Sequence, residues 1–166
     1  RKENGLIKII TGIRRCGKST LLELFKQYLL STGVEAEAII FLNFEERETA
    51  RFASWEDSYD FIMDTLSRQV KRYVFLDEVQ MLPHFEKLID ALYVKKDIDL
   101  YVTGSNAFLL SSELSTLLSG RYISINLHPF SFAEYVAAFP NVQDRGYLFR
   151  QYMNNSCFPA AVTLSQ

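Results

Sequence analysis

The segment Gly12–Ser19 combines two glycines, a lysine and a serine at the spacing of a phosphate-binding loop. Gly12 is followed by four residues and then by the triplet Gly-Lys-Ser at positions 17–19, which fits the pattern G-x-x-x-x-G-K-[ST] without a mismatch. Glycines let backbone N–H groups turn inward around phosphate oxygens, and a following helix presents its positive N-terminal end. We therefore predict that Lys18 reaches the β- and γ-phosphates of a nucleotide and that the Ser19 hydroxyl ligates Mg²⁺.

Two arginines and a cysteine lie inside this loop. Arg14 and Arg15 are expected to point to solvent or to pair with nearby acids, and contact with a ligand or a neighbouring subunit is the alternative. Cys16 is expected to be a small residue that fills the loop, at a position where oxidation or alkylation would inhibit. Three polar residues follow the second apolar run, and we expect them to form a solvated acidic turn. The alternative is that they lie near the nucleotide, because ligands bind at the carboxyl edge of such sheets. These residues are Asn43, Glu45 and Glu46.

Two adjacent acids, Asp77 and Glu78, follow the apolar run of "YVFLDEVQ". A carboxylate at the carboxyl end of a buried strand can hold Mg²⁺, usually through water, and we assign this role to Asp77. Glu78 can accept a proton from an attacking water or orient it. An exposed acidic turn is the alternative for such a pair. A kinase must keep water out, so a carboxylate placed for water favours hydrolysis.

A polar turn and one arginine complete the candidate site. Ser105 and Asn106 follow a fourth apolar run, and either side chain could reach the γ-phosphate or the attacking water; their alternative role is simply to form the turn. Arg121 follows a glycine between a helix and a strand. It is either a solvated strand flank or an arginine finger that faces the nucleotide of a neighbouring subunit.

Alternating strands and helices must position these residues. Apolar runs predict strands over residues 6–11, 38–44, 73–80, 99–107 and 121–127. Helical spacing predicts helices after the loop, after the capping-box pair Ser54 and Asp57, after Pro83, over 110–118, and after Ser131 with Glu134. This alternation predicts an α/β fold, a three-layer αβα sandwich around a mainly parallel five-stranded sheet. It stops near residue 140, so we expect a core over 1–140 and the beginning of a helical carboxy-terminal region over 141–166.

The bulk properties exclude several classes of protein. The chain has 166 residues, a formal charge of −2 and two cysteines, which indicates one soluble domain, no disulfide framework and a cytoplasmic location. This charge gives no argument for binding nucleic acid, and no run is long and apolar enough to span a membrane. The two histidines have no spacing to other metal ligands. The first residue is not methionine, and the chain is interpreted as a piece of a longer protein.

Five segments, in this order, resemble a family of prokaryotic AAA-type ATPases whose ATPase domain is joined to a carboxy-terminal domain of unknown role. They are "ITGIRRCGKSTLL", "FLNFEE", "YVFLDEVQ", "YVTGSNAFLLSSELSTLLSGRY" and "HPFSFAEY", and the resemblance runs over about residues 6–159. It implies the additional-strand (AAA/RecA-like) branch of P-loop NTPases. In that branch the loop strand is central and the acid-bearing strand is not its immediate neighbour.

The resemblance also implies roles for individual residues. Walker B would be Asp77 and Glu78, the sensor would fall at Ser105 or Asn106, and Arg121 would act between the subunits of a homo-oligomer. No counterpart of the family's lid or carboxy-terminal domain is found here, so a second, nucleotide-sensing arginine cannot be placed. Walker A would comprise Gly12, Ile13, Arg14, Arg15, Cys16, Gly17, Lys18, Ser19 and Thr20.

The residues and the resemblance together predict an ATP-binding, Mg²⁺-dependent ATPase domain that drives or switches a partner domain. The choice of adenine rests on the resemblance alone. One alternative is a nucleotide-gated switch with little turnover, which needs the same residues. A small-molecule kinase is opposed by Glu78 and by the sensor turn. A nucleic-acid-binding module is opposed by the net charge, unless a segment outside this sequence supplies the basic surface.

Overall fold

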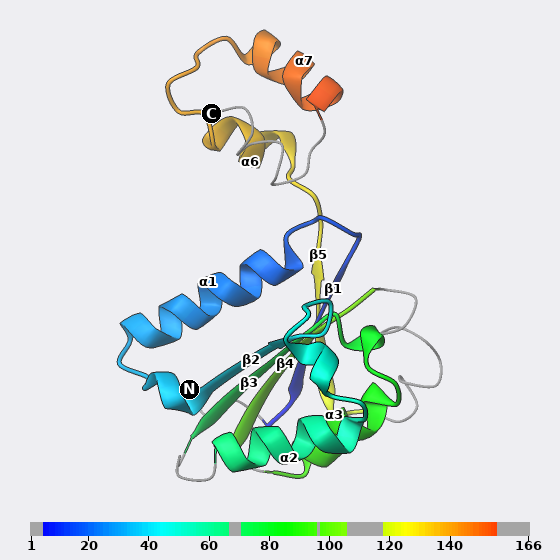
Figure 1. Ribbon diagram of the computed structural model, residues 1–166. Coiled ribbons are helices and arrows are strands. Elements are labelled where there is room, and N and C mark those ends of the chain that lie inside the picture. Colours follow the sequence, from blue (N-terminus) through cyan, green and yellow to red (C-terminus); the bar gives the residue numbers. More distant parts are fainter. Residues whose placement is uncertain (1–4, 67–70, 96, 106–117, 156–166) are drawn as a thin grey trace.

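Five parallel strands form the sheet that carries the candidate site (Figure 1). In the computed structural model, which describes residues 5–66, 71–95, 97–105 and 118–155, these strands are β1 (Ile7–Gly12), β2 (Ile39–Asn43), β3 (Arg72–Asp77), β4 (Ile98–Thr103) and β5 (Tyr122–Leu127). Their order is β2-β3-β4-β1-β5, and every neighbouring pair is parallel. The predicted five-stranded parallel sheet is confirmed. The order implied by the resemblance is confirmed too, because β4 separates the acid-bearing β3 from β1.

Helices cover both faces of this sheet, which gives the predicted three layers (Figure 1). They are α1 (Lys18–Ser31) on one face and α2 (Trp55–Thr65) with α3 (Phe85–Tyr93) on the other. Leu22 of α1 packs in one hydrophobic cluster with Ile10 and Phe75, whereas Ile62 and Leu88 of the other two helices cluster with the opposite face. Because both faces are covered, β1 is buried along its whole length, as an uninterrupted apolar run predicts.

The two strands that carry the acids and the polar turn are shorter than predicted. β3 ends at Asp77 and β4 at Thr103, whereas the apolar runs predicted strands over 73–80 and 99–107. Glu78 has a left-handed backbone with φ 51°, which turns the chain out of the strand direction into a short 3₁₀ helix. The 3₁₀ helices are η1 (Ala36–Ala38), η2 (Thr49–Arg51) and η3 (Val79–Met81). The helix predicted over 110–118 lies largely outside the described residues.

Both predicted capping boxes are present. The backbone N–H of Asp57 donates to the Ser54 hydroxyl over 3.2 Å, and the Ser54 N–H donates to the Asp57 carboxylate over 3.0 Å. Ser131 and Glu134 make the same exchange at the start of α6 (Phe132–Ala137). Hydrogen bonds from the Ser131 backbone and hydroxyl hold the pKa of Glu134 below its ordinary value. This cap therefore stabilises α6 above the ordinary pKa of glutamate and is lost as the pH falls through the lowered pKa.

Two helices after β5 form a small cluster of their own. Tyr135 of α6 and Leu148 of α7 (Arg145–Asn155) are buried against aromatic neighbours, and the Tyr152 hydroxyl donates to the Phe130 carbonyl over 2.9 Å. Figure 1 shows both helices beyond the carboxyl end of β5, away from the sheet. The predicted boundary at residue 140 falls between them and stays a prediction, although this packing groups the two helices together.

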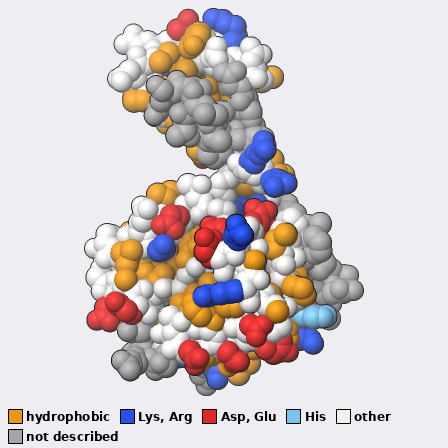
Figure 2. Space-filling model, in the orientation of Figure 1, with side chains coloured by type: hydrophobic (Ala, Val, Ile, Leu, Met, Phe, Trp, Pro, Cys, Tyr) orange, Lys and Arg blue, Asp and Glu red, His pale blue; other side chains and the backbone are white. Residues whose placement is uncertain are grey.

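Charged side chains of both signs are found on the face of the molecule seen in Figure 2. On the face seen in Figure 2, acidic and basic side chains of the described residues are interspersed with apolar ones, in keeping with the formal charge of −2. Among the described residues, no helix is both long and apolar enough to cross a membrane.

Candidate functional site

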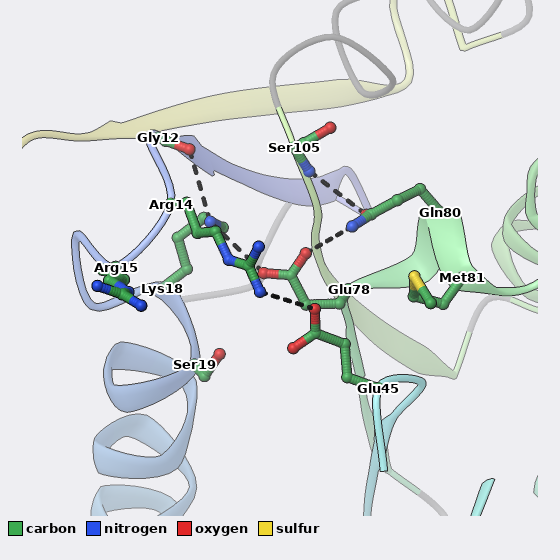
Figure 3. A pocket seen from close by; sticks show the side chains of 10 residues that line it. All are labelled: Gly12, Arg14, Arg15, Lys18, Ser19, Glu45, Glu78, Gln80, Met81 and Ser105. Carbon is green, nitrogen blue, oxygen red and sulfur yellow. Dashed lines mark hydrogen bonds and ion pairs between the residues drawn. The ribbon is translucent and has the colours of Figure 1, made fainter. Parts of the chain in front are cut away.

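The carboxyl ends of β1, β3 and β4 meet at one edge of the sheet and border a pocket of about 580 Å³ (Figure 3). This arrangement follows from the topology, because parallel strands place the residues that follow them on the same edge. The predicted site residues that line the pocket are Gly12, Arg14, Arg15, Lys18, Ser19, Glu78 and Ser105. Three further lining residues are Glu45, Gln80 and Met81.

The first glycine of the loop occupies a position where a side chain does not fit. A Cβ at Gly12 would lie 2.4 Å from the backbone carbonyl oxygen of Leu127 and 2.6 Å from the Cys16 sulfur. Cys16 is buried with 3% exposure, so its thiol fills the space beneath the loop. Gly17 caps α1 with φ 99°, and Arg15 also has a positive φ, 68°. The loop is thus held against β5 by a close backbone approach that requires glycine.

We expect Gly12→Ala to lower the free energy of unfolding by more than Gly33→Ala does. Both glycines have positive φ, but nothing lies within 4 Å of a Cβ at Gly33, so that variant measures backbone strain alone, about 1–3 kcal/mol. The added methyl at position 12 meets a strand carbonyl, which has little freedom to move. Chemical denaturation of the two variants measures the difference. Equal losses would show that the Leu127 contact adds nothing.

Lys18 begins α1 and its side chain lies inside the site. Its Nζ is 3.5 Å from the Glu78 Oε1 and donates to the Gly12 carbonyl over 3.5 Å. The lysine is 6% exposed, so its charge is largely removed from water and is balanced by this carboxylate. Figure 3 shows the Ser19 hydroxyl directed toward the pocket from the first turn of α1. A cation and a hydroxyl thus face the space that a phosphate group would fill.

Asp77 is fully buried at the end of β3, next to Thr103 at the end of β4. The Thr103 hydroxyl donates to Oδ1 of Asp77 and accepts the backbone N–H of Glu78 over 3.1 Å. Oδ2 of Asp77 has no hydrogen-bond partner within the described part of the chain. A buried carboxylate oxygen without a partner is costly unless a ligand satisfies it. Such a carboxylate oxygen is a ligand that suits Mg²⁺ or a water bound to Mg²⁺, although Asp77 is not among the residues that line the pocket.

Glu78 is held from two sides. Lys18 lies at its Oε1, and the Gln80 side-chain amide donates to its Oε2 over 2.6 Å. Gln80 also accepts the backbone N–H of Ser105 over 3.3 Å (Figure 3). The carboxylate therefore lines the pocket with two partners, Lys18 and Gln80, and Gln80 is held in turn by Ser105.

The sequence did not assign a site role to Gln80 or Thr103, two residues of this edge. Gln80 and Thr103 stand inside the motifs "YVFLDEVQ" and "TGSNA", but their contacts depend on the turn at Glu78 and on the β3–β4 pairing. Glu45 was expected in a solvated turn, with a position near the nucleotide as the alternative. It is exposed but lines the pocket, with its Oε1 4.0 Å from Nη2 of Arg14.

Arg121 lies at the opposite edge of the sheet. It precedes β5, and its carbonyl accepts the backbone N–H of Ile7 at the start of β1 over 2.9 Å. Its guanidinium donates to Oδ1 of Asp90 over 2.8 Å and lies over the ring of Tyr93. The structure thus does not bring Arg121 to the pocket of its own chain, and a role on a neighbour's nucleotide stays a prediction. Asn106 lies outside the described residues, and Ile13 and Thr20 are exposed at the loop and at the first turn of α1.

Known proteins are similar to this chain in sequence or in fold. An uncharacterised protein of Haemophilus influenzae is 40% identical over 166 residues, which cover 97% of this chain and 41% of the relative. One from Methanocaldococcus jannaschii is 28% identical over 130 residues, 78% of this chain and 28% of the relative. The chain therefore spans less than half of the length of either. The solved structure of C. elegans PCH-2 has a similar fold, with a TM-score of 0.58 at 18% identity over 82% of this chain and 38% of that one.

The strand order, the glycine loop and the paired acids agree with the match to a family model. The model described as "AAA domain" matches residues 4–136, which include the loop, both acids and all five described strands. This chain belongs to that family of AAA-type P-loop ATPases.

Proposed function

We propose that this domain binds ATP with Mg²⁺ and hydrolyses it to ADP and phosphate, and that the full-length protein couples this reaction to a partner domain. The observation that carries the proposal is the position of Glu78. It lines the same pocket as the phosphate loop, with its carboxylate 3.5 Å from the Lys18 ammonium. The site thus offers a phosphate-binding cation and a candidate base for water within one space.

The residues of the chain divide the work in a simple way. Lys18 and the backbone N–H groups of the loop bind the phosphates, and Glu78 takes a proton from the water that attacks the γ-phosphorus. The bond between the γ-phosphorus and the bridging oxygen breaks, and ADP leaves with that oxygen. The Ser19 hydroxyl and Asp77 would hold Mg²⁺, which neutralises charge on the phosphate oxygens when bound. Oδ2 of Asp77, for which the described part of the chain offers no hydrogen-bond partner, supports this assignment.

We expect Lys18 to exchange Glu78 for phosphate when a nucleotide binds. Because a lysine forms strong hydrogen bonds with phosphate, we expect the phosphates to replace the Glu78 carboxylate as its partner. The ion pair therefore occupies both residues only while the site holds no nucleotide. This exchange links nucleotide binding to the release of the candidate base.

Lys18→Ala tests the binding step. We expect the affinity of the full-length protein for MgATP to fall about 10- to 100-fold, the worth of a hydrogen bond between charged groups. Isothermal titration calorimetry measures the dissociation constant. Lys87→Ala is the matched control, because Lys87 is exposed on α3 and lies outside the pocket. Equal affinity in the parent and in Lys18→Ala would overturn the assignment of the loop.

A further inference from the structure

Gln80 contacts both Glu78, two residues before it in the chain, and Ser105, 25 residues after it. Its amide nitrogen donates to Oε2 of Glu78 over 2.6 Å, and its amide oxygen accepts the backbone N–H of Ser105 over 3.3 Å. Figure 3 shows the side chain spanning the space between the β3 turn and the end of β4. The contact is therefore a bridge between the candidate base and the candidate sensor turn.

The two partners fix which way the amide points. A carboxylate can only accept a hydrogen bond, and a backbone N–H can only donate one. If the amide of Gln80 were rotated by 180°, its oxygen would face the Glu78 carboxylate and its nitrogen would face the Ser105 N–H. Both contacts would then be repulsive. The position of the Ser105 N–H thus selects the amide orientation that holds Glu78.

We propose that Gln80 is a positioning residue that couples the Ser105 turn to the Glu78 carboxylate. This inference rests on the proposed hydrolysis of ATP. When Lys18 turns to the phosphates, the Gln80 amide still fixes Oε2 of Glu78, and Oε1 becomes available to water. A shift of the Ser105 turn toward the γ-phosphate moves the acceptor side of the same amide. Glu78 thereby responds to the presence of the γ-phosphate through one side chain.

A second hydrogen bond joins the same two segments. The Thr103 hydroxyl, two residues before Ser105, accepts the backbone N–H of Glu78 over 3.1 Å. The end of β4 therefore contacts Glu78 at the backbone through Thr103 and at the side chain through Gln80. The bond to Thr103 positions the backbone of Glu78, and the bond to Gln80 positions its carboxylate.

Gln80→Leu in the full-length protein tests the inference, since leucine keeps much of the side-chain volume and removes both hydrogen bonds. We expect kcat for ATP to fall about 10-fold, the usual worth of a hydrogen bond to a charged group. The MgATP dissociation constant should change less than about 3-fold, because Gln80 acts through Glu78 and not on the phosphates. Gln80→Ala is a second variant that adds no apolar surface. Gln27→Leu is the matched control, because Gln27 is exposed on α1.

A double-variant cycle separates positioning from a general structural role. In a Glu78→Gln background, Gln80→Leu should cause no further loss of turnover, because its effect passes through the missing carboxylate. A full additional loss in that background, or equal losses of kcat and of affinity, would overturn the inference. Unchanged turnover in both Gln80 variants, in a parent that needs Glu78, would overturn the inference alone. A parent that binds ATP without turnover would overturn the proposed hydrolysis together with it.

Discussion

Replacing Glu78 by glutamine should slow ATP turnover about 10²- to 10⁴-fold while MgATP still binds, the usual worth of a general base. Glutamine has the shape of glutamate but cannot take a proton from water. The structure adds an expectation for binding. Lys18 lies 3.5 Å from the Glu78 carboxylate and is expected to exchange it for phosphate, so removing that charge should leave the affinity equal or raise it.

Phosphate release and titration calorimetry on the full-length protein measure these two quantities. Glu45→Gln is the matched control, because Glu45 also lines the pocket but pairs with Arg14 at its exposed rim. Undiminished hydrolysis in Glu78→Gln would move the base elsewhere, with Glu45 and Glu46 the first residues to test. A parent that binds MgATP tightly, with turnover as slow as that of the variant, would instead indicate a nucleotide-gated switch.

The parts of the fold that could be predicted are those that local sequence specifies. The apolar runs predicted all five strands. For β1, β3 and β4 this follows from nearly continuous burial, which a sheet covered on both faces requires, whereas β5 at the edge of the sheet is largely exposed. The loop could be recognised because its residue types and their spacing form a pattern within one short segment of the chain. The contact that requires glycine at position 12 is not local, since a Cβ there would meet the carbonyl of Leu127 at the end of β5. The strand order came from the resemblance, because periodicity alone does not order strands.

The contacts of Gln80 and Thr103 could not be predicted in this way. Gln80 reaches Glu78 because Glu78 adopts a left-handed backbone conformation. Glycine or asparagine would have indicated that conformation in the sequence, but glutamate does not. Thr103 reaches Asp77 because β3 and β4 are neighbours that end at the same edge. Both contacts depend on tertiary structure, so the sequence motifs located the site but did not predict the hydrogen bonds within it.

The side-chain contacts of Arg121 could not be predicted from the sequence either. Its partner Asp90 lies on α3, 31 residues earlier, and the two meet because α3 packs beside the amino end of β5. This pair gives Arg121 a possible local role that competes with the predicted one. Both side chains are more than 40% exposed, and exposed ion pairs contribute only about 0–1 kcal/mol to stability. The pair therefore holds Arg121 weakly, and its guanidinium remains accessible to a neighbouring subunit.

Arg121→Ala should reveal whether a second subunit completes the site. An arginine that acts on a neighbour's nucleotide stabilises transition-state charge only in an assembly, and such residues contribute about 10³–10⁵ in rate. We expect the specific ATPase activity of the full-length protein to rise with protein concentration and the variant to lose that rise. ATP affinity should stay nearly intact, because Arg121 lies at the sheet edge opposite to its own pocket. Turnover measured across a dilution series provides the test.

Asp90→Asn is the control that separates the two roles of Arg121, because it removes the same ion pair but leaves the guanidinium in place. If Arg121 acts on a neighbouring subunit, Asp90→Asn should keep the concentration-dependent activity that Arg121→Ala loses. If the local pair is what matters, both variants should lose the same small amount of stability and keep the same turnover. If the specific ATPase activity of the parent protein does not depend on its concentration, the local role is favoured, since no neighbouring subunit is then needed to complete the site. The comparison thus assigns Arg121 either to the nucleotide of another subunit or to the solvated flank of β5.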